Sequence, residues 1–180
     1  LRSTLLTILM LKMISAQIFS GGLNFITTAA DNASSVYAAD LDGDGDMDVL
    51  SVSNADDKIA WYENDGEGNF GDQIVITTAA DWATSVYAAD LDADGDMDVL
   101  SASYSDDKIA WYENDGFGNF GEQIVITTDA DYAQSVYAAD IDGDGDMDVL
   151  SASKNDDKIA WYENLGGTDG GTDGGTDGGT

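Results

Sequence analysis

Three stretches of nine residues each carry five aspartates at alternating positions, and successive stretches start 50 residues apart. The first reads Asp-Leu-Asp-Gly-Asp-Gly-Asp-Met-Asp over residues 40–48, and the others occupy residues 90–98 and 140–148. Carboxylates packed this closely repel one another unless a cation neutralises them. The D-x-D-x-D-G order also places oxygen ligands on one side of a sharp turn, which is how proteins hold a hard cation. The spacing therefore predicts three Ca²⁺ sites.

The aspartate stretches lie in a repeat of 50 residues whose other segments read as short β-strands. These segments are rich in β-branched and aromatic residues, have period-2 character and are bounded by Gly, Asp and Asn. Four short antiparallel strands per repeat predict an all-β chain of three β-propeller blades, a partial propeller or arc. A β-sandwich or a solenoid is the alternative all-β arrangement. In the second repeat the four segments are residues 85–89, 98–103, 108–113 and 123–128.

The two ends of the chain differ from the repeats. Residues 1–16 read as a secretory signal peptide, because Arg2 precedes a short apolar run and small residues allow cleavage near Ala16. An N-terminal helix or the remnant of an earlier blade is the alternative. Residues 165–180 repeat Gly, Thr and Asp, which predicts a flexible linker to further sequence. The blades fill residues 17–164, at about 21–71, 72–121 and 122–164.

Composition narrows the chemistry that the chain can perform. Cysteine and histidine are absent from the 180 residues, which excludes disulfides, thiolate or imidazole zinc sites, and cysteine or histidine catalysis. The formal net charge of −30 repels nucleic acids and anionic membranes even after three Ca²⁺ have bound. The apolar run near the N-terminus is too short to span a bilayer. We therefore expect neither a nucleic-acid partner nor a membrane span.

The repeated strings carry a resemblance to a known family. V-Y-A-A-D-L-D-G-D-G-D-M-D-V-L, followed by K-I-A-W-Y-E-N-D-G-x-G-N-F-G, resembles the FG-GAP/VCBS repeats of integrin α-subunit propellers and of many secreted bacterial proteins. The resemblance covers residues from about 21 to 164. It implies a β-propeller with one calcium loop per blade, placed between the first two strands. Family members typically have seven blades, whereas this chain has three repeats, so closure of a ring is not implied.

The resemblance also implies a role for each aspartate of a loop. The first, third, fifth and ninth positions supply side-chain oxygens, and the seventh supplies its backbone carbonyl. The sixth position, which is Gly45 in the first loop, suits a residue that is free to adopt positive φ. Ser51 stands where an EF-hand would place a bidentate glutamate, so these loops are not EF-hands. The implied metal residues are Asp40, Asp42, Asp44, Asp46 and Asp48, then Asp90, Asp92, Asp94, Asp96 and Asp98, and finally Asp140, Asp142, Asp144, Asp146 and Asp148.

Two glycine-rich segments satisfy the G-x-G-x-x-G pattern, at residues 66–71 and 116–121. A dinucleotide-binding loop needs a strand before it and a helix after it. Here another β segment follows each glycine-rich stretch. We therefore interpret both as hairpin turns, and we expect no organic cofactor.

The repeats differ from one another at two equivalent loop positions. One is occupied by Asn32, Trp82 and Tyr132, and the other by Asn54, Tyr104 and Lys154. Because successive connections of a blade alternate between its two ends, both positions are expected on the face opposite the aspartate loops. Exposed aromatic residues in loops on a rigid scaffold favour binding, of sugars in particular. Ordinary variation of solvent-facing loops is the alternative. The candidate ligand-binding residues are Trp82, Tyr104, Tyr132 and Lys154.

These observations favour a secreted or cell-surface calcium-binding module for adhesion or for binding a polysaccharide or a protein. The alternatives are an architectural spacer in a larger secreted protein, and a non-catalytic or catalytic part of a calcium-dependent polysaccharide lyase. We expect no enzymatic activity, because Lys154 and a few tyrosines form no recognisable catalytic group. We expect the protein to be extracellular or at the cell surface. Three blades also leave open edges, which predicts a homo-oligomer or further blades in a longer chain.

Overall fold

The computed structural model describes residues 22–166. Within these residues the chain forms eleven β-strands and no helix. The signal peptide predicted at residues 1–16 lies outside the described residues, as does all but the first two residues of the predicted linker. The strands are β1 (Ala33–Ala39), β2 (Asp48–Ser53), β3 (Lys58–Tyr62), β4 (Ile74–Thr77), β5 (Ala83–Ala89), β6 (Asp98–Ser103), β7 (Lys108–Tyr112), β8 (Ile124–Thr127), β9 (Ala133–Ala139), β10 (Asp148–Ser153) and β11 (Lys158–Tyr162).

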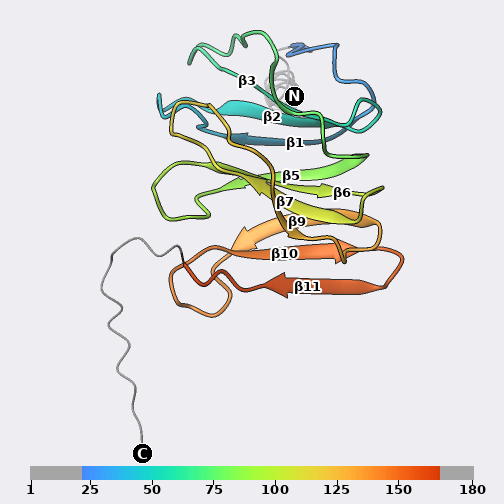
Figure 1. Cartoon of the computed structure of the whole chain (residues 1–180). Coiled ribbons are helices and arrows are strands. Elements are labelled where there is room, and N and C mark those ends of the chain that lie inside the picture. Colours follow the sequence, from blue (N-terminus) through green and yellow to red (C-terminus); the bar gives the residue numbers. More distant parts are fainter. Residues whose placement is uncertain (1–21, 167–180) are drawn as a thin grey trace, which may run out of the picture.

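The strands form three antiparallel sheets that follow one another along the chain. The order is β1-β2-β3-β4 in blade 1, β5-β6-β7-β8 in blade 2 and β9-β10-β11 in blade 3. Figure 1 shows the three sheets stacked face to face, with blade 2 between the other two. The first strands of the blades, β1, β5 and β9, lie next to one another. This arrangement confirms the predicted all-β fold of propeller blades that form an open arc. Four strands were predicted for each repeat, but blade 3 has only three within the described residues.

Alternation along the first strand of a blade directs its side chains to two different neighbours. In β5, Val86 and Ala88 belong to the hydrophobic cluster shared with blade 1, whereas Tyr87 and Ala89 belong to the cluster shared with blade 3. Successive side chains of a strand point to opposite faces of the sheet, which explains this division. Each inner strand therefore contributes to two cores at once.

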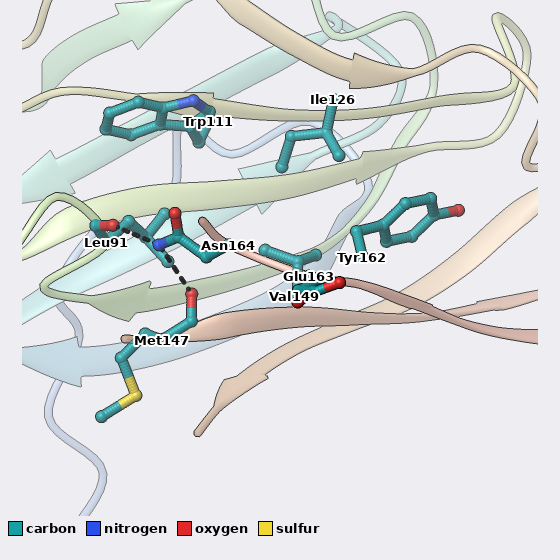
Figure 2. A pocket seen from close by; sticks show the side chains of 8 residues that line it. All are labelled: Leu91, Trp111, Ile126, Met147, Val149, Tyr162, Glu163 and Asn164. Carbon is teal, nitrogen blue, oxygen red and sulfur yellow. Dashed lines mark hydrogen bonds between the residues drawn. The ribbon is translucent and has the colours of Figure 1, made fainter. Parts of the chain in front are cut away.

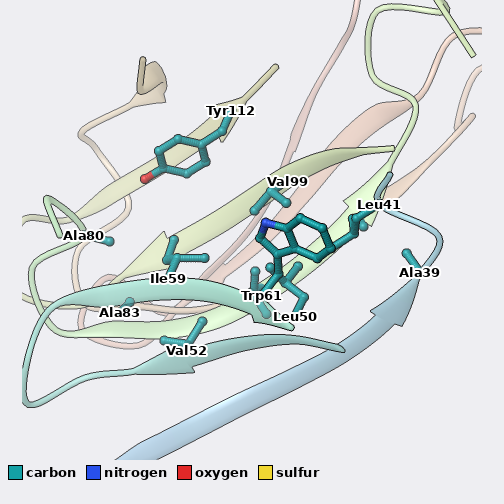
Figure 3. Packing of buried hydrophobic residues seen from close by; sticks show 12 residues of the cluster. Ala39, Leu41, Leu50, Val52, Ile59, Trp61, Ala80, Ala83, Val99 and Tyr112 are labelled. Atoms are coloured by element: carbon teal, nitrogen blue, oxygen red, sulfur yellow. The ribbon is translucent and has the colours of Figure 1, made fainter. Parts of the chain in front are cut away.

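The hydrophobic core lies between the blades. At the first junction, Leu50, Ile59 and Trp61 of blade 1 pack with Val99 and Tyr112 of blade 2 (Figure 3). The second junction repeats this packing between blades 2 and 3. A blade is one sheet thick and cannot cover its own apolar faces, so each blade depends on its neighbour for burial of those faces.

The outer face of blade 3 has the residues of a junction but no sheet against it in the part of the chain that the structure describes. Trp61 is 3% exposed at the first junction, whereas the equivalent Trp161 is 45% exposed. The repeated tryptophan is thus a packing residue at the first junction, whereas Trp161 lies on an open face. Among residues 22–166, no helix is long and apolar enough to cross a membrane.

The glycine-rich segments are hairpin turns, as the sequence predicts. The turn of blade 1 joins β3 to β4, and Asn64 and Phe70 form an antiparallel bridge across it. Asp65 N donates a hydrogen bond to Asn69 O over 3.1 Å. A β-strand follows each turn, so the context of a dinucleotide-binding loop is not met.

Candidate metal centres

Each aspartate loop connects the first two strands of its blade. In blade 1 the loop begins directly after β1 and ends at Asp48, which is the first residue of β2. The sharp turn inside the loop places Gly45 at a φ of 95°, in the region that favours glycine. Gly95 and Gly145 adopt the same conformation, with φ of 101° and 106°. The prediction of positive φ at the sixth position is therefore confirmed in all three loops.

Three carboxylates of each loop lie close enough to hold one metal ion. Their ligand atoms are within 4.8 Å of one another. In the first and third loops the group comprises the first, third and ninth positions, whereas in the second loop it comprises the first, third and fifth. The structure thus gathers nine of the fifteen predicted metal residues. They are Asp40, Asp42 and Asp48; Asp90, Asp92 and Asp94; and Asp140, Asp142 and Asp148.

The ninth aspartate is also a structural anchor. Asp48 is fully buried, and its two carboxylate oxygens accept hydrogen bonds from Leu41 N and Asn64 N, each over 2.9 Å. The first bond closes the aspartate loop, and the second ties that loop to the turn after β3. Asp98 and Asp148 accept the equivalent bonds. The carboxylate therefore holds two loops of the blade together whether or not a metal ion is bound.

The pKa values of the three ninth-position aspartates are shifted in different directions. Desolvation raises the pKa of Asp98 to about 7 and also raises the pKa of Asp48. The pKa of Asp148 is instead lowered, chiefly by the hydrogen bonds from Asn164 N and Ile141 N. The side chains of Asp98 and Asp148 are equally inaccessible to solvent, but further blades lie on both sides of Asp98 and only on one side of Asp148. More protein therefore surrounds the Asp98 carboxylate, and its charged form is more strongly desolvated.

The first aspartate turns its side chain back over the loop. Asp40 Oδ1 accepts a hydrogen bond from Gly43 N over 2.9 Å, and its Oδ2 accepts one from Gly45 N over 3.0 Å. In the second loop Ala93 replaces the glycine at the fourth position, with a φ of 64°. There Asp90 Oδ1 is buried without a hydrogen-bond partner. A buried carboxylate oxygen without a donor requires a compensating positive charge, so the donor set and this oxygen fit a hard cation such as Ca²⁺.

The fifth and seventh aspartates have different surroundings. Asp44 Oδ1 accepts a hydrogen bond from Asp46 N over 2.8 Å. Asp46 does not belong to the carboxylate group, and its carboxylate lies against Gly66 of the following turn. Asp96 lies in the same way against Gly116. The backbone carbonyl of the seventh position as a ligand stays a prediction.

Sequence reasoning missed the asparagine that connects the loops of neighbouring blades. Asn114 Nδ2 donates hydrogen bonds to Leu41 O of blade 1 over 2.8 Å and to Met97 O over 3.0 Å. Figure 2 shows the equivalent residue, Asn164, between Leu91 O and Met147 O. The signal was present in the sequence, because an asparagine follows each Trp-Tyr-Glu segment. Its role could not be predicted from the sequence, because the carbonyl that accepts its hydrogen bond belongs to a loop 73 residues earlier.

The candidate ligand-binding residues lie at the opposite end of the blades from the aspartate loops, as predicted. Trp82 directly precedes β5, and Tyr104 directly follows β6. The backbone N–H of Tyr104 donates a hydrogen bond to Trp82 O over 3.1 Å. Lys154 N donates to Tyr132 O over 3.2 Å in the same way. The rings of Tyr104 and Tyr132 meet across the boundary of blades 2 and 3, with centroids 4.0 Å apart. The structure therefore brings these two tyrosines together.

Trp82 and Tyr132 adopt a backbone conformation that is unfavourable for aromatic residues. Their φ angles are 53° and 57°, and Trp82 is 44% exposed. Each backbone N–H is held by a carboxylate, with Asp57 Oδ1 2.8 Å from Trp82 N and Asp107 Oδ1 2.9 Å from Tyr132 N. Asn32, the equivalent residue of blade 1, is of a type that tolerates this region. A left-handed conformation costs a non-glycine residue about 1–2 kcal/mol.

Comparisons with known proteins agree with the fold. A family model described as an FG-GAP-like repeat matches residues 40–101 and 90–151. No curated protein matches the sequence. Among solved structures, a lectin of Agrocybe aegerita that recognises non-reducing terminal N-acetylglucosamine is 21% identical with a TM-score of 0.51, over 67% of this chain and 32% of the lectin.

Two further solved structures are similar over smaller parts of much larger chains. The Tc holotoxin pore of Photorhabdus luminescens is 21% identical with a TM-score of 0.49, over 75% of this chain and 6% of that chain. The biofilm matrix protein Bap1 of V. cholerae is 26% identical with a TM-score of 0.42, over 71% of this chain and 19% of that chain. This chain thus spans a third or less of the length of each of these three structures.

Proposed function

The chain belongs to the FG-GAP-like repeat family, and on that premise we propose that it is a secreted or cell-surface binding module stabilised by calcium. Its ligand is a carbohydrate or a protein, and the ligand contacts the face that carries Trp82, Tyr104 and Tyr132. The observation that carries this proposal is the placement of these aromatic residues. Two of them occupy strained backbone positions, and two of them touch across a blade boundary.

Three aspartate groups would hold the calcium, one in each blade. When bound, Ca²⁺ supplies positive charge to carboxylates that otherwise repel one another. The chain itself holds the loop in shape. Asp48 and its equivalents fix the loop to the next turn, and the glycine at the sixth position allows the chain to reverse. The metal therefore has a structural role at the face opposite the ligand, and it is not part of the binding surface.

Strain supports a binding role for the aromatic face. An asparagine at the equivalent position of blade 1 satisfies the same backbone with less strain, so the backbone conformation does not explain the choice of Trp82 and Tyr132. A broad, rigid aromatic surface on loops of a β scaffold suits the apolar ring face of a sugar. Lys154 lies next to Tyr132 and offers an ammonium group that can donate hydrogen bonds to sugar hydroxyls.

A glycan array with purified protein tests this proposal. We expect retention in calcium, and we expect the double variant Trp82→Ala, Tyr132→Ala to lose it while keeping its melting temperature. Phe117→Ala is the matched control, because Phe117 is an exposed aromatic residue in a turn at the aspartate-loop end. Retention that survives the double variant would refute the aromatic site. An array without any hit for the wild-type protein would favour the architectural spacer.

We also propose that the chain has no catalytic activity of its own. A lyase needs a base and a group that neutralises the substrate carboxylate within one cleft. On the aromatic face Lys154 lies beside Tyr132, and the ring of Tyr132 packs against the ring of Tyr104. Incubation with alginate, pectate and hyaluronan in calcium should release no unsaturated product at 235 nm. Measurable release above a boiled-protein control would overturn this part of the proposal.

A further inference from the structure

The two junctions between blades use the same three hydrogen bonds, displaced by 50 residues. In the first bond, a hydroxyl of the first strand of one blade donates to a backbone carbonyl of the next blade. In the second, a serine hydroxyl of the first strand accepts from a valine N–H of the next blade. In the third, an asparagine side chain donates to a backbone carbonyl in the aspartate loop of the preceding blade. The bonds of the first junction are Ser34 Oγ to Ala83 O (3.1 Å), Val86 N to Ser35 Oγ (3.3 Å) and Asn114 Nδ2 to Leu41 O (2.8 Å); those of the second are Thr84 Oγ1 to Ala133 O (2.9 Å), Val136 N to Ser85 Oγ (3.3 Å) and Asn164 Nδ2 to Leu91 O (2.7 Å).

Blade 3 and blade 1 present the two halves of a third junction. Ile159 of blade 3 is 78% exposed, although Ile59 and Ile109 are fully buried at the junctions that exist. Val36 of blade 1 is 70% exposed, whereas Val86 is 4% exposed. The polar groups of this third junction are also present at the two free faces. Counting 50 residues along, blade 3 offers the Gln134 amide, which replaces the hydroxyl of Ser34 and Thr84, together with Ser135 Oγ and Ile141 O. Blade 1 offers Ala33 O, Val36 N and Asn64 Nδ2.

Blade 3 also has an open strand edge. In blades 1 and 2 the third strand is covered by a fourth, β4 or β8. Among the described residues, β11 has no partner on that side. The positions 50 residues after β8 read Gly-Gly-Thr-Asp instead of Ile-Val-Ile-Thr, and glycine and aspartate are disfavoured in strands. An exposed edge of this kind is a template for a strand from another chain.

The sequence of a spare fourth strand lies before blade 1. Residues 23–28 read Leu-Asn-Phe-Ile-Thr-Thr, and residues 73–78, which contain β4, read Gln-Ile-Val-Ile-Thr-Thr. Residues 23–28 form no strand here, and none of the turn and loop backbone hydrogen bonds found in residues 22–166 involves them. Phe25 is 73% exposed and lines a groove of about 320 Å³ with Val36 and Tyr62.

Within the described residues of one molecule these features cannot meet. Blade 2 separates blade 1 from blade 3, so the residues 23–28 of a chain are at the far end of the arc from its own β11 (Figure 1). We propose that two copies of this chain close into a ring of six blades, in which residues 23–28 of each copy form the fourth strand of blade 3 of the other. Six blades lie within the usual range of about 4–8 for propellers. The ring has two identical junctions and no open edge.

The register of the donated strand follows from the existing blades. Ala60 pairs with Val75 and Ala110 pairs with Val125. Counting 50 residues along, Ala160 of one copy should lie opposite Phe25 of the other. The formal charge of −30 per chain opposes association, and the aspartate loops lie beside each junction. Calcium bound in those loops should therefore promote closure of the ring.

Cysteine cross-linking tests the register, because the chain has no cysteine of its own. Single variants Phe25→Cys and Ala160→Cys are mixed in calcium and oxidised. We expect a disulfide-linked dimer on a non-reducing gel. Ile26→Cys is the matched control for Phe25→Cys, because adjacent residues of a strand point to opposite faces, and it should cross-link poorly to Ala160→Cys. Equal cross-linking of the two pairs would overturn the proposed register.

Sedimentation velocity tests the ring itself. The wild-type chain of 18.9 kDa should sediment in calcium as a dimer. Ile159→Lys should weaken the dimer by more than about tenfold and leave the fold intact, because Ile159 is exposed in the single chain. Phe117→Lys, which changes an exposed aromatic residue outside the junction, should not weaken it. A monomer at all concentrations, which is the result expected if further blades of a longer chain fill this face, would overturn the proposal. An open polymer would overturn the closed ring.

Discussion

Asp98 shows how an aspartate of a predicted metal loop can serve the fold. Its two oxygens accept backbone hydrogen bonds from Leu91 and Asn114, so that it joins the aspartate loop to the turn after β7. In the sequence it looks like the other aspartates of its loop. Its burial could not be predicted from spacing alone, because burial depends on how the aspartate loop and the turn after β7 fold over the carboxylate. The unpartnered oxygen of Asp90 could not be predicted either, since it depends on the detailed geometry of the loop.

Substitutions within one loop should separate these roles. Asp98→Ala should lower the free energy of unfolding by about 2–4 kcal/mol even in EDTA, because it leaves two buried backbone N–H groups without acceptors. Asp96→Ala, the control, should cost less than about 1 kcal/mol, because the Asp96 side chain lies against Gly116 outside the carboxylate group. Urea denaturation of both variants provides the measurement. Equal losses for the two variants would show that Asp98 is not a special anchor.

The blade is the element that the sequence predicts best. The 50-residue repeat predicted the three sheets, the order of strands within them and the hairpin turns, because each depends on local alternation and on turn residues. The junctions were harder to predict. Asn114 reaches a carbonyl 73 residues away, and the pairing of Tyr104 with Tyr132 depends on how two blades stack. Contacts between blades are set by stacking geometry, which a single sequence does not display.

The asparagine contacts give a test at the level of the blade. Asn114→Ala should lower the free energy of unfolding by about 1–3 kcal/mol, because Leu41 O loses a buried donor. Asn64→Ala is the matched control, because Asn64 Nδ2 donates to Met47 O of its own blade and to no other blade in the single chain. Both variants are compared in the Ile159→Lys background, where association contributes nothing to stability. An equal effect of the two substitutions would contradict a role for Asn114 between blades.

The molecule as a whole combines extreme acidity with a core that is divided among thin sheets. The chain carries 36 acidic residues, and fifteen of them lie in three short loops at one end of the blades. In the proposed function, calcium at that end would relieve repulsion where neighbouring blades are joined by asparagine, and the opposite end would be free to contact a ligand. The open faces of blades 1 and 3 follow from the same architecture, because every blade needs a neighbour on both sides.

Calorimetry of the whole protein with and without calcium tests the account most directly. Three sites with dissociation constants of about 10⁻⁴ to 10⁻³ M should each add about 1–2 kcal/mol of stability at roughly 5 mM Ca²⁺. For a domain of this size that corresponds to a rise in melting temperature of roughly 10–20 °C over the protein in EGTA. Titration calorimetry should give a stoichiometry of about three Ca²⁺ per chain, one for each aspartate group. A melting temperature that does not change between EGTA and millimolar calcium would contradict the account.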